Sequence, residues 1–215
     1  MKQNRIIRKI FYYQLFAYIL SSLTRTVGGM IDGIIIGQCL GIDSIAAFGI
    51  ISPLLIAFAI FGTVVSKGAM NQFTKLIGEG QIEMARGIFS LSLIITVGAA
   101  VLVMFCILIF SAKLAGILGA SGHAVHLLPK ARAYLIGIAI GLPAINAMHV
   151  LNNYMTIDND INLPVIASAV LTIINIIFDL LVVFVIHGDT FEIGFATSIS
   201  YYVAVIVLLL HFRKK

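Results

Sequence analysis

Six long apolar runs, separated by short polar segments, dominate the hydropathy pattern of the chain. They cover residues 10–38, 44–65, 85–110, 133–151, 163–186 and 191–212. Each run is close to or above the ~20 residues that an α-helix needs to cross a bilayer. In lipid the backbone must satisfy its own hydrogen bonds, so such runs predict helices. The pattern therefore predicts an all-α, polytopic membrane protein, with residues 1–215 forming a single domain, a bundle of six transmembrane helices.

Prolines and one long polar link modify this pattern. Pro53 and Pro143 predict kinks in the second and fourth helices, which membrane helices tolerate where neighbours satisfy the freed backbone groups. The link 66–84 is amphipathic and contains Gly78 and Gly80. We expect this link to lie at the membrane interface, between the second and third helices.

The composition supports a membrane protein and argues against several other classes. Of the 215 residues, 60% are hydrophobic and 11% are charged, whereas soluble domains carry about 25% charged residues. The net charge is +5, but no basic patch is interleaved with aromatic residues, so we expect contact with anionic lipid and not with nucleic acid. Cys39 and Cys106 lack metal or disulfide spacing. The first residues have no small-residue cleavage site after a short apolar core, which predicts a retained segment rather than a signal peptide.

The basic residues are divided unequally between the two ends of the predicted bundle. Three lie on one side, Lys113, Lys130 and Arg132, and ten lie on the other: Lys2, Arg5, Arg8, Lys9, Lys67, Lys75, Arg86, Arg213, Lys214 and Lys215. The positive-inside rule then predicts that both termini are cytoplasmic. We expect a multi-pass protein of the plasma (inner) membrane. The link 152–162 falls on the cytoplasmic side although its charged residues are Asp158 and Asp160, because the rule counts basic residues only.

Two carboxylates lie well inside apolar runs, Asp32 in the first and Asp179 in the fifth. A charged side chain at this depth costs at least ~2.5–3.5 kcal/mol, so each should face a polar interior or bind something. Two buried acids that meet can share a proton that a cation or substrate displaces, which makes a proton or cation site the favoured interpretation. Alternatively, each acid has a structural partner. Arg25 is the candidate charge partner, since it lies seven residues before Asp32 on the same helical face.

Three neutral polar residues are candidates to join the two acids. Asn175 lies four residues before Asp179 and shares its helical face. Thr197 lies in the sixth run and Asn152 at the end of the fourth. Their oxygens can coordinate a cation or hydrogen-bond to a carboxyl group. Taken singly, each is more often a contact between helices.

A series of motifs resembles the multidrug and toxic compound extrusion (MATE) transporters. The motifs follow the family order and cover most of the chain: IDGIIIG at 31–37, Leu40-Gly41, IAAFGI at 45–50, Ser52-Pro53, the glycine-bounded link 68–86, the stretch 151–164, NIIFD at 175–179 and IGFAT at 193–197. No single motif is specific to the family, but the ordered series is.

The resemblance implies a fold and an activity. Family members pack twelve helices as two six-helix lobes around a central cavity, and they export organic cations and drugs in exchange for protons or sodium ions. This chain then corresponds to the amino-terminal lobe. Asp32 and Asp179 match the cation site, and Asn175, Thr197 and Asn152 match its polar neighbours. The resemblance implies no enzymatic activity and no cofactor besides H⁺ or Na⁺ as the coupling ion.

The chain also departs from the family pattern. Residues 155–159 read MTIDN where the family usually has an Arg and a Gly, and Arg25 is not part of the pattern. A fixed positive charge near Asp32 could replace the transported ion. Six helices make one lobe, so either a second six-helix chain completes the cavity, two copies pair, or the chain is an inactive, truncated lobe.

Two other functions are weighed against the antiporter. A lipid-linked sugar flippase of the same superfamily should place more cationic residues in its cavity, where here only Arg25 qualifies. An intramembrane aspartyl protease shares a proton between two aspartates, but such enzymes usually place a Gly before the second Asp. In this chain Asp32 follows Ile31 and Asp179 follows Phe178, which argues against the protease.

Overall fold

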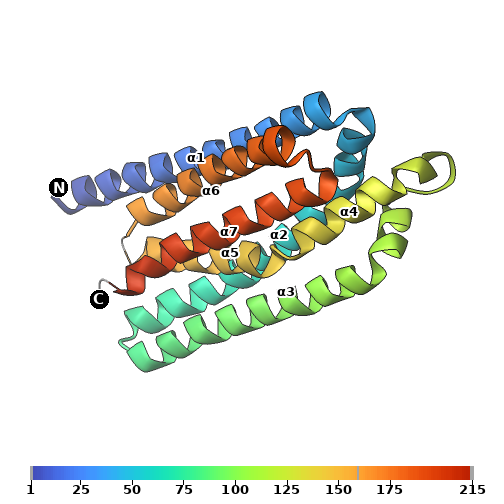
Figure 1. Ribbon diagram of the computed structural model, residues 1–215. Helices are drawn as coiled ribbons and strands as arrows, with labels where there is room; N and C mark the ends of the chain where they lie inside the picture. The colour runs from blue at the N-terminus through green and yellow to red at the C-terminus, as the bar shows by residue number, and fades with distance from the viewer. Residues whose placement is uncertain (1, 159, 214–215) are drawn as a thin grey trace.

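The chain folds into a bundle of helices, shown in Figure 1. The computed structural model describes residues 2–158 and 160–213, and within them there is no strand. The elements are α1 (Lys2–Ile35), the π-helical turn η1 (Ile36–Leu40), α2 (Ile42–Gly78), α3 (Ile82–Leu118), the 3₁₀ turn η2 (Gly122–Leu127), α4 (Leu128–Ala139), α5 (Leu142–Ile157), α6 (Asn162–Leu181), the π-helical turn η3 (Val182–Ile186) and α7 (Thr190–Arg213).

The predicted six crossings are confirmed. Five helices of the described chain are long and apolar enough to cross a membrane. The sixth crossing is made by η2 with α4 and by α5, two pieces bent by 45° at their junction. Pro143 lies at the start of α5, so the kink expected there is confirmed. Helix α2, in contrast, continues through Pro53 to Gly78.

The prediction that residues 66–84 form a separate link between the second and third helices is wrong. Helix α2 continues to Gly78 and α3 already begins at Ile82, so only residues 79–81 link them. Gly80 has φ +77° in this turn, a conformation that favours glycine. Hydropathy marks the part of a helix that lies in hydrocarbon, but the backbone continues to form helical hydrogen bonds beyond it. The other predicted runs are extended in the same way, as in α3, where the run 85–110 lies within 82–118.

Both ends of the described chain lie at the same end of the bundle, as an even number of crossings requires (Figure 1). The α2–α3 turn and the α5–α6 link lie at this end too. The side chain of His211 on α7 binds both acidic residues of that link, with Nε2 2.6 Å from Asp158 Oδ2 and Nδ1 2.8 Å from Asp160 Oδ2. Asn159, Lys214 and Lys215 lie outside the described residues.

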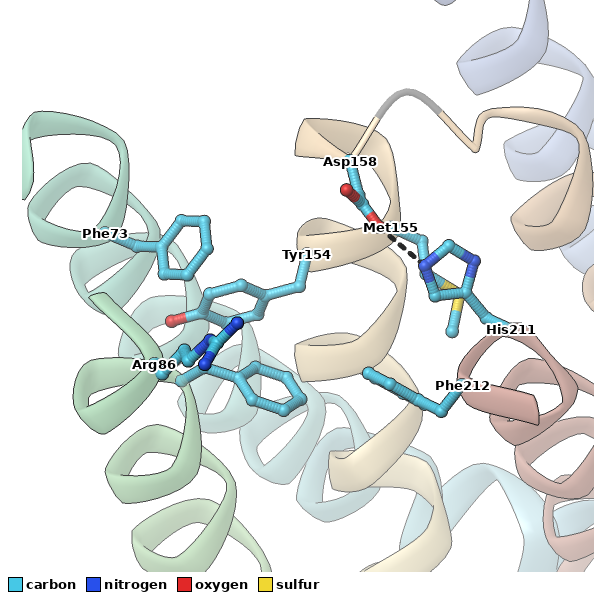
Figure 2. Close-up of a pocket in the computed structure, with 8 residues that line it drawn as sticks. Phe73, Arg86, Tyr154, Met155, Asp158, His211 and Phe212 are labelled. Carbon is cyan, nitrogen blue, oxygen red and sulfur yellow. Dashed lines mark hydrogen bonds and ion pairs between the residues drawn. The ribbon is translucent and has the colours of Figure 1, made fainter. Parts of the chain in front are cut away.

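A small pocket opens beside this histidine. Figure 2 shows Asp158 and His211 on one side of it and the Tyr154 ring on the other. Tyr154 packs edge-on against Phe73 and Phe89, with ring centroids 4.7 and 4.6 Å apart. These contacts hold the ends of α2, α3, α5 and α7 together, so this end of the lobe is tied by aromatic packing and by the histidine–carboxylate contacts.

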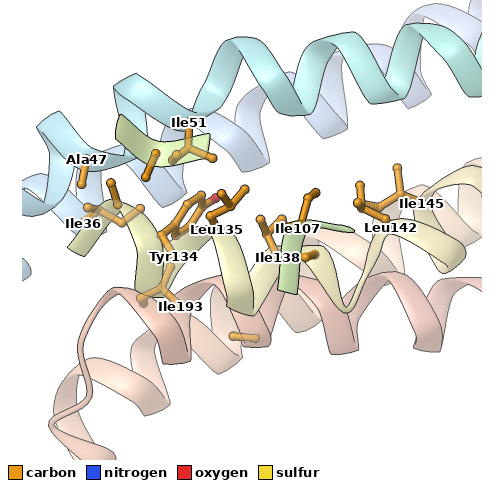
Figure 3. Packing of buried hydrophobic residues seen from close by; sticks show 14 of the residues in the cluster. Ile36, Ala47, Ile51, Ile107, Tyr134, Leu135, Ile138, Leu142, Ile145 and Ile193 are labelled. Atoms are coloured by element: carbon orange, nitrogen blue, oxygen red, sulfur yellow. The ribbon is translucent and has the colours of Figure 1, made fainter. Parts of the chain in front are cut away.

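The main hydrophobic core lies towards the opposite end. Figure 3 shows Ile36, Ala47 and Ile51 facing Tyr134, Leu135 and Ile138 of α4. Helices α4 and α7 approach each other closely behind this layer, at Gly137 and Gly194. A methyl group on Gly194 would lie 2.7 Å from the carbonyl oxygen of Tyr134. The hydroxyl group of Ser198 donates to the carbonyl of Gly137 at 2.7 Å.

Helix α1 stands apart from this core. It packs mainly on α6, and Gly28 permits the contact, because a methyl group there would come within 3.0 Å of the Thr172 side chain. The Thr172 hydroxyl donates to the carbonyl of Thr24 at 3.3 Å. Nearer the amino terminus, the Tyr13 hydroxyl donates to Asn162. The position of α1 therefore depends largely on its contacts with α6.

The close α4–α7 approach predicts a stability effect. We expect Gly194→Ala to lower the free energy of unfolding by about 1–3 kcal/mol, because the added methyl group has no space and overpacks the helix contact. Thermal unfolding of the purified protein in detergent measures this. Gly98→Ala is the matched control, since Gly98 is exposed and a methyl group there meets nothing within 4 Å. Equal unfolding midpoints for the two variants would contradict the predicted contact.

Candidate functional site

Asp32 of α1 and Asp179 of α6 meet inside the lobe. Asp179 is fully buried, Asp32 is half-buried, and the two carboxyl groups lie within hydrogen-bonding reach of each other. Each keeps a buried Oδ1 atom that has no hydrogen-bond partner in the described part of the chain. The structure thus brings the two predicted acids together and leaves an unsatisfied oxygen on each.

The electrostatics of this pair favour an added positive charge. Two negative charges 4 Å apart repel by about 4 kcal/mol at an effective dielectric constant of 20. Among the described residues, ion pairs form elsewhere, and neither Asp32 nor Asp179 lies within 4.0 Å of a basic nitrogen. A proton shared between the carboxyls, or a bound cation, would relieve the repulsion.

Two of the predicted neutral residues complete this cluster. The amide nitrogen of Asn175 donates to Asp179 Oδ2 at 3.3 Å and lies 3.5 Å from the hydroxyl oxygen of Thr197. Thr197 in turn donates to the carbonyl of Ile193 at 3.2 Å. Helices α1, α6 and α7 therefore each contribute to one polar cluster in an otherwise apolar layer.

Asn152 forms no side-chain hydrogen bond to this cluster in the described part of the chain. Its neighbours Leu151 and Met155 belong to a second core group that contains Leu171 of α6, whereas Asn175 and Asp179 lie one and two turns further along that helix. The Oδ1 atom of Asn152 is buried without a hydrogen-bond partner in the described part of the chain. Its membership of the cation site stays a prediction.

Arg25 does not pair with either acid. Its guanidinium group lies more than 4.0 Å from every carboxylate oxygen in the described chain. Arg25 is half-buried, and its charge acts on His149 of α5 and Tyr201 of α7. The alternative that Arg25 forms an ion pair with one of the acids is therefore not observed in this conformation.

Two tyrosines near the acids were not singled out from the sequence. Tyr134 of α4 is buried, packs edge-on against Phe48 at 5.4 Å, and lies within electrostatic reach of both Asp32 and Asp179. Tyr201 lies within reach of Asp32 as well as Arg25. Their sequence positions carry no signal of this, because tyrosines in apolar runs are ordinary core residues and only the packing of α4 and α7 brings them to the site.

A cavity of about 370 Å³ opens beside the acid cluster. Five helices contribute to its wall, which is mostly apolar: Gly29, Phe48, Ser52, Leu55, Ile56, Ala59, Tyr134, Ile138, Leu142, Ile145, Thr197 and Tyr201. Thr197 connects the cavity to the acids, since it is part of the polar cluster. An apolar cavity with a few convergent polar groups is the usual form of a small-molecule site.

Several solved structures share the fold of this chain and are longer than it. A MATE crystal structure in complex with MaD3S matches with a TM-score of 0.84 and 22% identity over 95% of this chain and 45% of its own. A crystal structure of MATE in the straight conformation matches with a TM-score of 0.85 and 20% identity. The match covers 95% of this chain and 44% of its own. A third match is a MOP superfamily transporter from Pyrococcus furiosus, whose binding pocket is described as having reverse polarity. Its TM-score is 0.83 at 22% identity, and the match covers 95% of this chain and 44% of its own. The chain thus spans less than half the length of these proteins.

Sequence comparison identifies the family itself. No curated protein matches the chain. A sequence model of the MatE family, in contrast, matches residues 17–181, which include the Asp32–Asp179 pair. This range is well over half of the 215 residues. The chain therefore belongs to the MatE (MATE) family of membrane transporters.

Proposed function

We propose that this chain is the amino-terminal lobe of a secondary antiporter that exports small organic cations in exchange for H⁺ or Na⁺. The observation that carries the proposal is the contact of Asp32 with Asp179, two intramembrane carboxylates with no basic partner among the described residues. A proton or a bound cation would supply the positive charge that relieves the repulsion between these carboxylates. Asn175 and Thr197 supply neutral groups around it.

The coupling would act on the contact between α1 and α6. When a proton or cation neutralises the pair, the two helices can remain together, and when it leaves, the carboxylates repel and α1 shifts. An organic cation in the adjoining cavity competes for the same negative charge. The coupling ion drives transport only if it binds one access state more tightly than the other. The limited packing of α1 outside α6 supports such a shift.

A second six-helix unit is part of this proposal. The chain covers 44–46% of the lengths of the transporters it resembles in fold, and one lobe supplies one wall of a central cavity. The partner would be a second chain or a second copy of this one. Without it, the chain would be an inactive lobe. Co-expression with a second lobe tests this requirement.

We also propose that both termini are cytoplasmic and that the protein lies in the plasma membrane. The support is the clustering of basic residues at one end of the bundle. Lys75 and Arg86 lie near the α2–α3 turn, at the same end as both ends of the described chain. The positive-inside rule assigns that end to the cytoplasm.

A lipid-linked sugar flippase is the second candidate function. Arg25 favours it, since a half-buried cation within a membrane-spanning helix suits an anionic lipid-linked substrate. The acid pair favours the antiporter, because a flippase of anionic substrates has no evident use for two carboxylates in contact.

The acid pair generates the first functional prediction. Asp32→Asn and Asp179→Asn should each abolish export of a fluorescent organic cation from an efflux-deficient bacterium, because an amide cannot exchange the proton or hold the ion. Collapsing the ion gradient should have the same effect on the unmodified protein. Asp43→Asn is the matched control, since Asp43 is an exposed acid at the start of α2. Export that survives both pair variants would contradict the proposal.

The neutral residues generate a second prediction. Asn175→Ala and Thr197→Val should weaken the apparent affinity for the driving ion by about tenfold or more without abolishing transport, because a hydrogen bond to a charged group contributes about 1.5–3 kcal/mol. The measurement is the initial rate of export in liposomes as the proton or sodium gradient is varied. If the export rate depends on the ion gradient in both variants as it does in the unmodified protein, Asn175 and Thr197 are not part of the ion site.

A further inference from the structure

We propose that the aromatic pocket beside His211 binds the headgroup of a zwitterionic membrane phospholipid, with the phosphate at Arg86 and the ammonium group at Asp158. Three observations carry the proposal: the depth of the pocket, the rings in its wall, and the two opposite charges in that wall. The site goes beyond the proposed function, because it does not involve the acid pair.

The pocket lies where membrane-spanning helices end. The α7 span ends at Phe212, and Arg86 lies four residues after the start of α3 at Ile82. Tyr154 lies three residues before the end of α5 at Ile157. All three side chains line the same cavity, whose volume is about 240 Å³. The ends of membrane helices lie at the boundary between hydrocarbon and headgroups, where tyrosine is enriched, so lipid headgroups are present at the depth of this pocket.

Aromatic rings form much of the pocket wall. Tyr154 stands edge-on to both Phe73 and Phe89, at interplanar angles of 87° and 73°. The Phe212 ring centroid lies 5.9 Å from that of Phe89, and Figure 2 shows Phe212 and His211 across the pocket from the Tyr154 ring. Such rings offer apolar surface to the part of a lipid next to its headgroup, and their faces attract an ammonium group.

The wall also presents one basic and one acidic side chain to the outside. The Arg86 side chain is 73% exposed and holds Glu83 through Nη1 at 3.2 Å. A guanidinium group has five N–H donors, so others can bind a phosphate. The Asp158 side chain is 44% exposed, and its Oδ2 lies 2.6 Å from His211 Nε2. A carboxylate accepts about four hydrogen bonds, so Asp158 can contact an ammonium group while it holds His211.

The charges around the pocket favour a zwitterionic headgroup over an anionic one. Anionic lipids are recognised by an excess of basic side chains. Here the basic side chains beside the α2–α3 turn are each paired with an acid, Lys75 with Glu79 at 3.9 Å and Arg86 with Glu83. A simple cation would meet the Arg86 guanidinium in the same wall as the rings. A headgroup that carries both a phosphate and an ammonium group complements both signs.

Quenching of tryptophan fluorescence by brominated lipid tests the site, because the chain contains no tryptophan of its own. Phe212→Trp places a single reporter in the pocket wall. Phe105→Trp is the matched control reporter, since Phe105 is an exposed ring of α3 outside this wall. The purified 215-residue chain is placed in nanodiscs of one fixed mixture of phosphatidylethanolamine, phosphatidylglycerol and a trimethylammonium-propane lipid. Only one of the three lipids is brominated in each sample.

We expect brominated phosphatidylethanolamine to quench the pocket reporter most strongly, with a preference equivalent to at least about tenfold tighter binding than either other lipid. The three lipids should quench the Phe105→Trp reporter equally. Phosphatidylglycerol lacks the ammonium group, and the trimethylammonium lipid lacks the phosphate, so each comparison isolates one of the two charges.

Variants in the Phe212→Trp background assign each charge to its residue. Asp158→Asn should remove the preference over phosphatidylglycerol and keep that over the trimethylammonium lipid. Arg86→Gln should have the reverse effect, so a folding defect in one variant leaves the other as a test. Glu79→Gln and Lys75→Gln are the matched controls and should keep both preferences, since this exposed pair lies outside the pocket wall.

Four results would overturn the proposal. Equal quenching of the pocket reporter by all three lipids would show contact with bulk lipid only, and strongest quenching by phosphatidylglycerol would show an anionic-lipid site. If soluble phosphorylethanolamine relieves the quenching as readily as unbrominated phosphatidylethanolamine does, the ligand is not a lipid. If tetraphenylphosphonium displaces the lipid, the pocket is a site for organic cations. None of these results bears on the Asp32–Asp179 pair, so the proposed function is tested separately.

Discussion

The contact between the Asp32 and Asp179 carboxyl groups is the interaction on which the functional account depends. It joins α1 to α6 at a depth where charge is costly, and no basic residue of the described chain neutralises it. Helix α1 packs mainly on α6, so the charge state of this pair bears directly on where α1 lies. Under the proposed function, binding of a proton or cation at the pair would therefore be linked to the position of α1.

The rest of the lobe is held by close helix contacts and by side-chain hydrogen bonds. Helices α4 and α7 meet backbone to backbone at Gly137 and Gly194, where even a methyl group has no space. At the terminal end, His211 binds the acidic α5–α6 link from α7. The cavity opens beside these regions, with Thr197 of the acid cluster in its wall. Under the proposed coupling, α1 would shift while these contacts persist.

The fold could be predicted from the sequence more completely than the site. Hydropathy identified the six crossings, and Pro143 predicted the break between α4 and α5, because both signals are local. The prediction of a link at 66–84 was wrong, because a helix can continue into a polar segment beyond its apolar run. For the site, the spacing of Asn175 and Asp179 predicted a shared face. The nearness of Tyr134 and Tyr201 to the acids could not be predicted, since it depends on how separate helices pack.

The most direct test of the central claim is to measure ion release when an organic cation binds. Purified protein in weakly buffered nanodiscs, loaded with radioactive sodium, is mixed with the cation while released protons and sodium are recorded together. The account predicts that one of the two ions is released as the organic cation binds, and that Asp32→Asn with Asp179→Asn in the same chain abolishes the release. Binding of the organic cation with no release of either ion would show that the carboxyl pair does not couple the two.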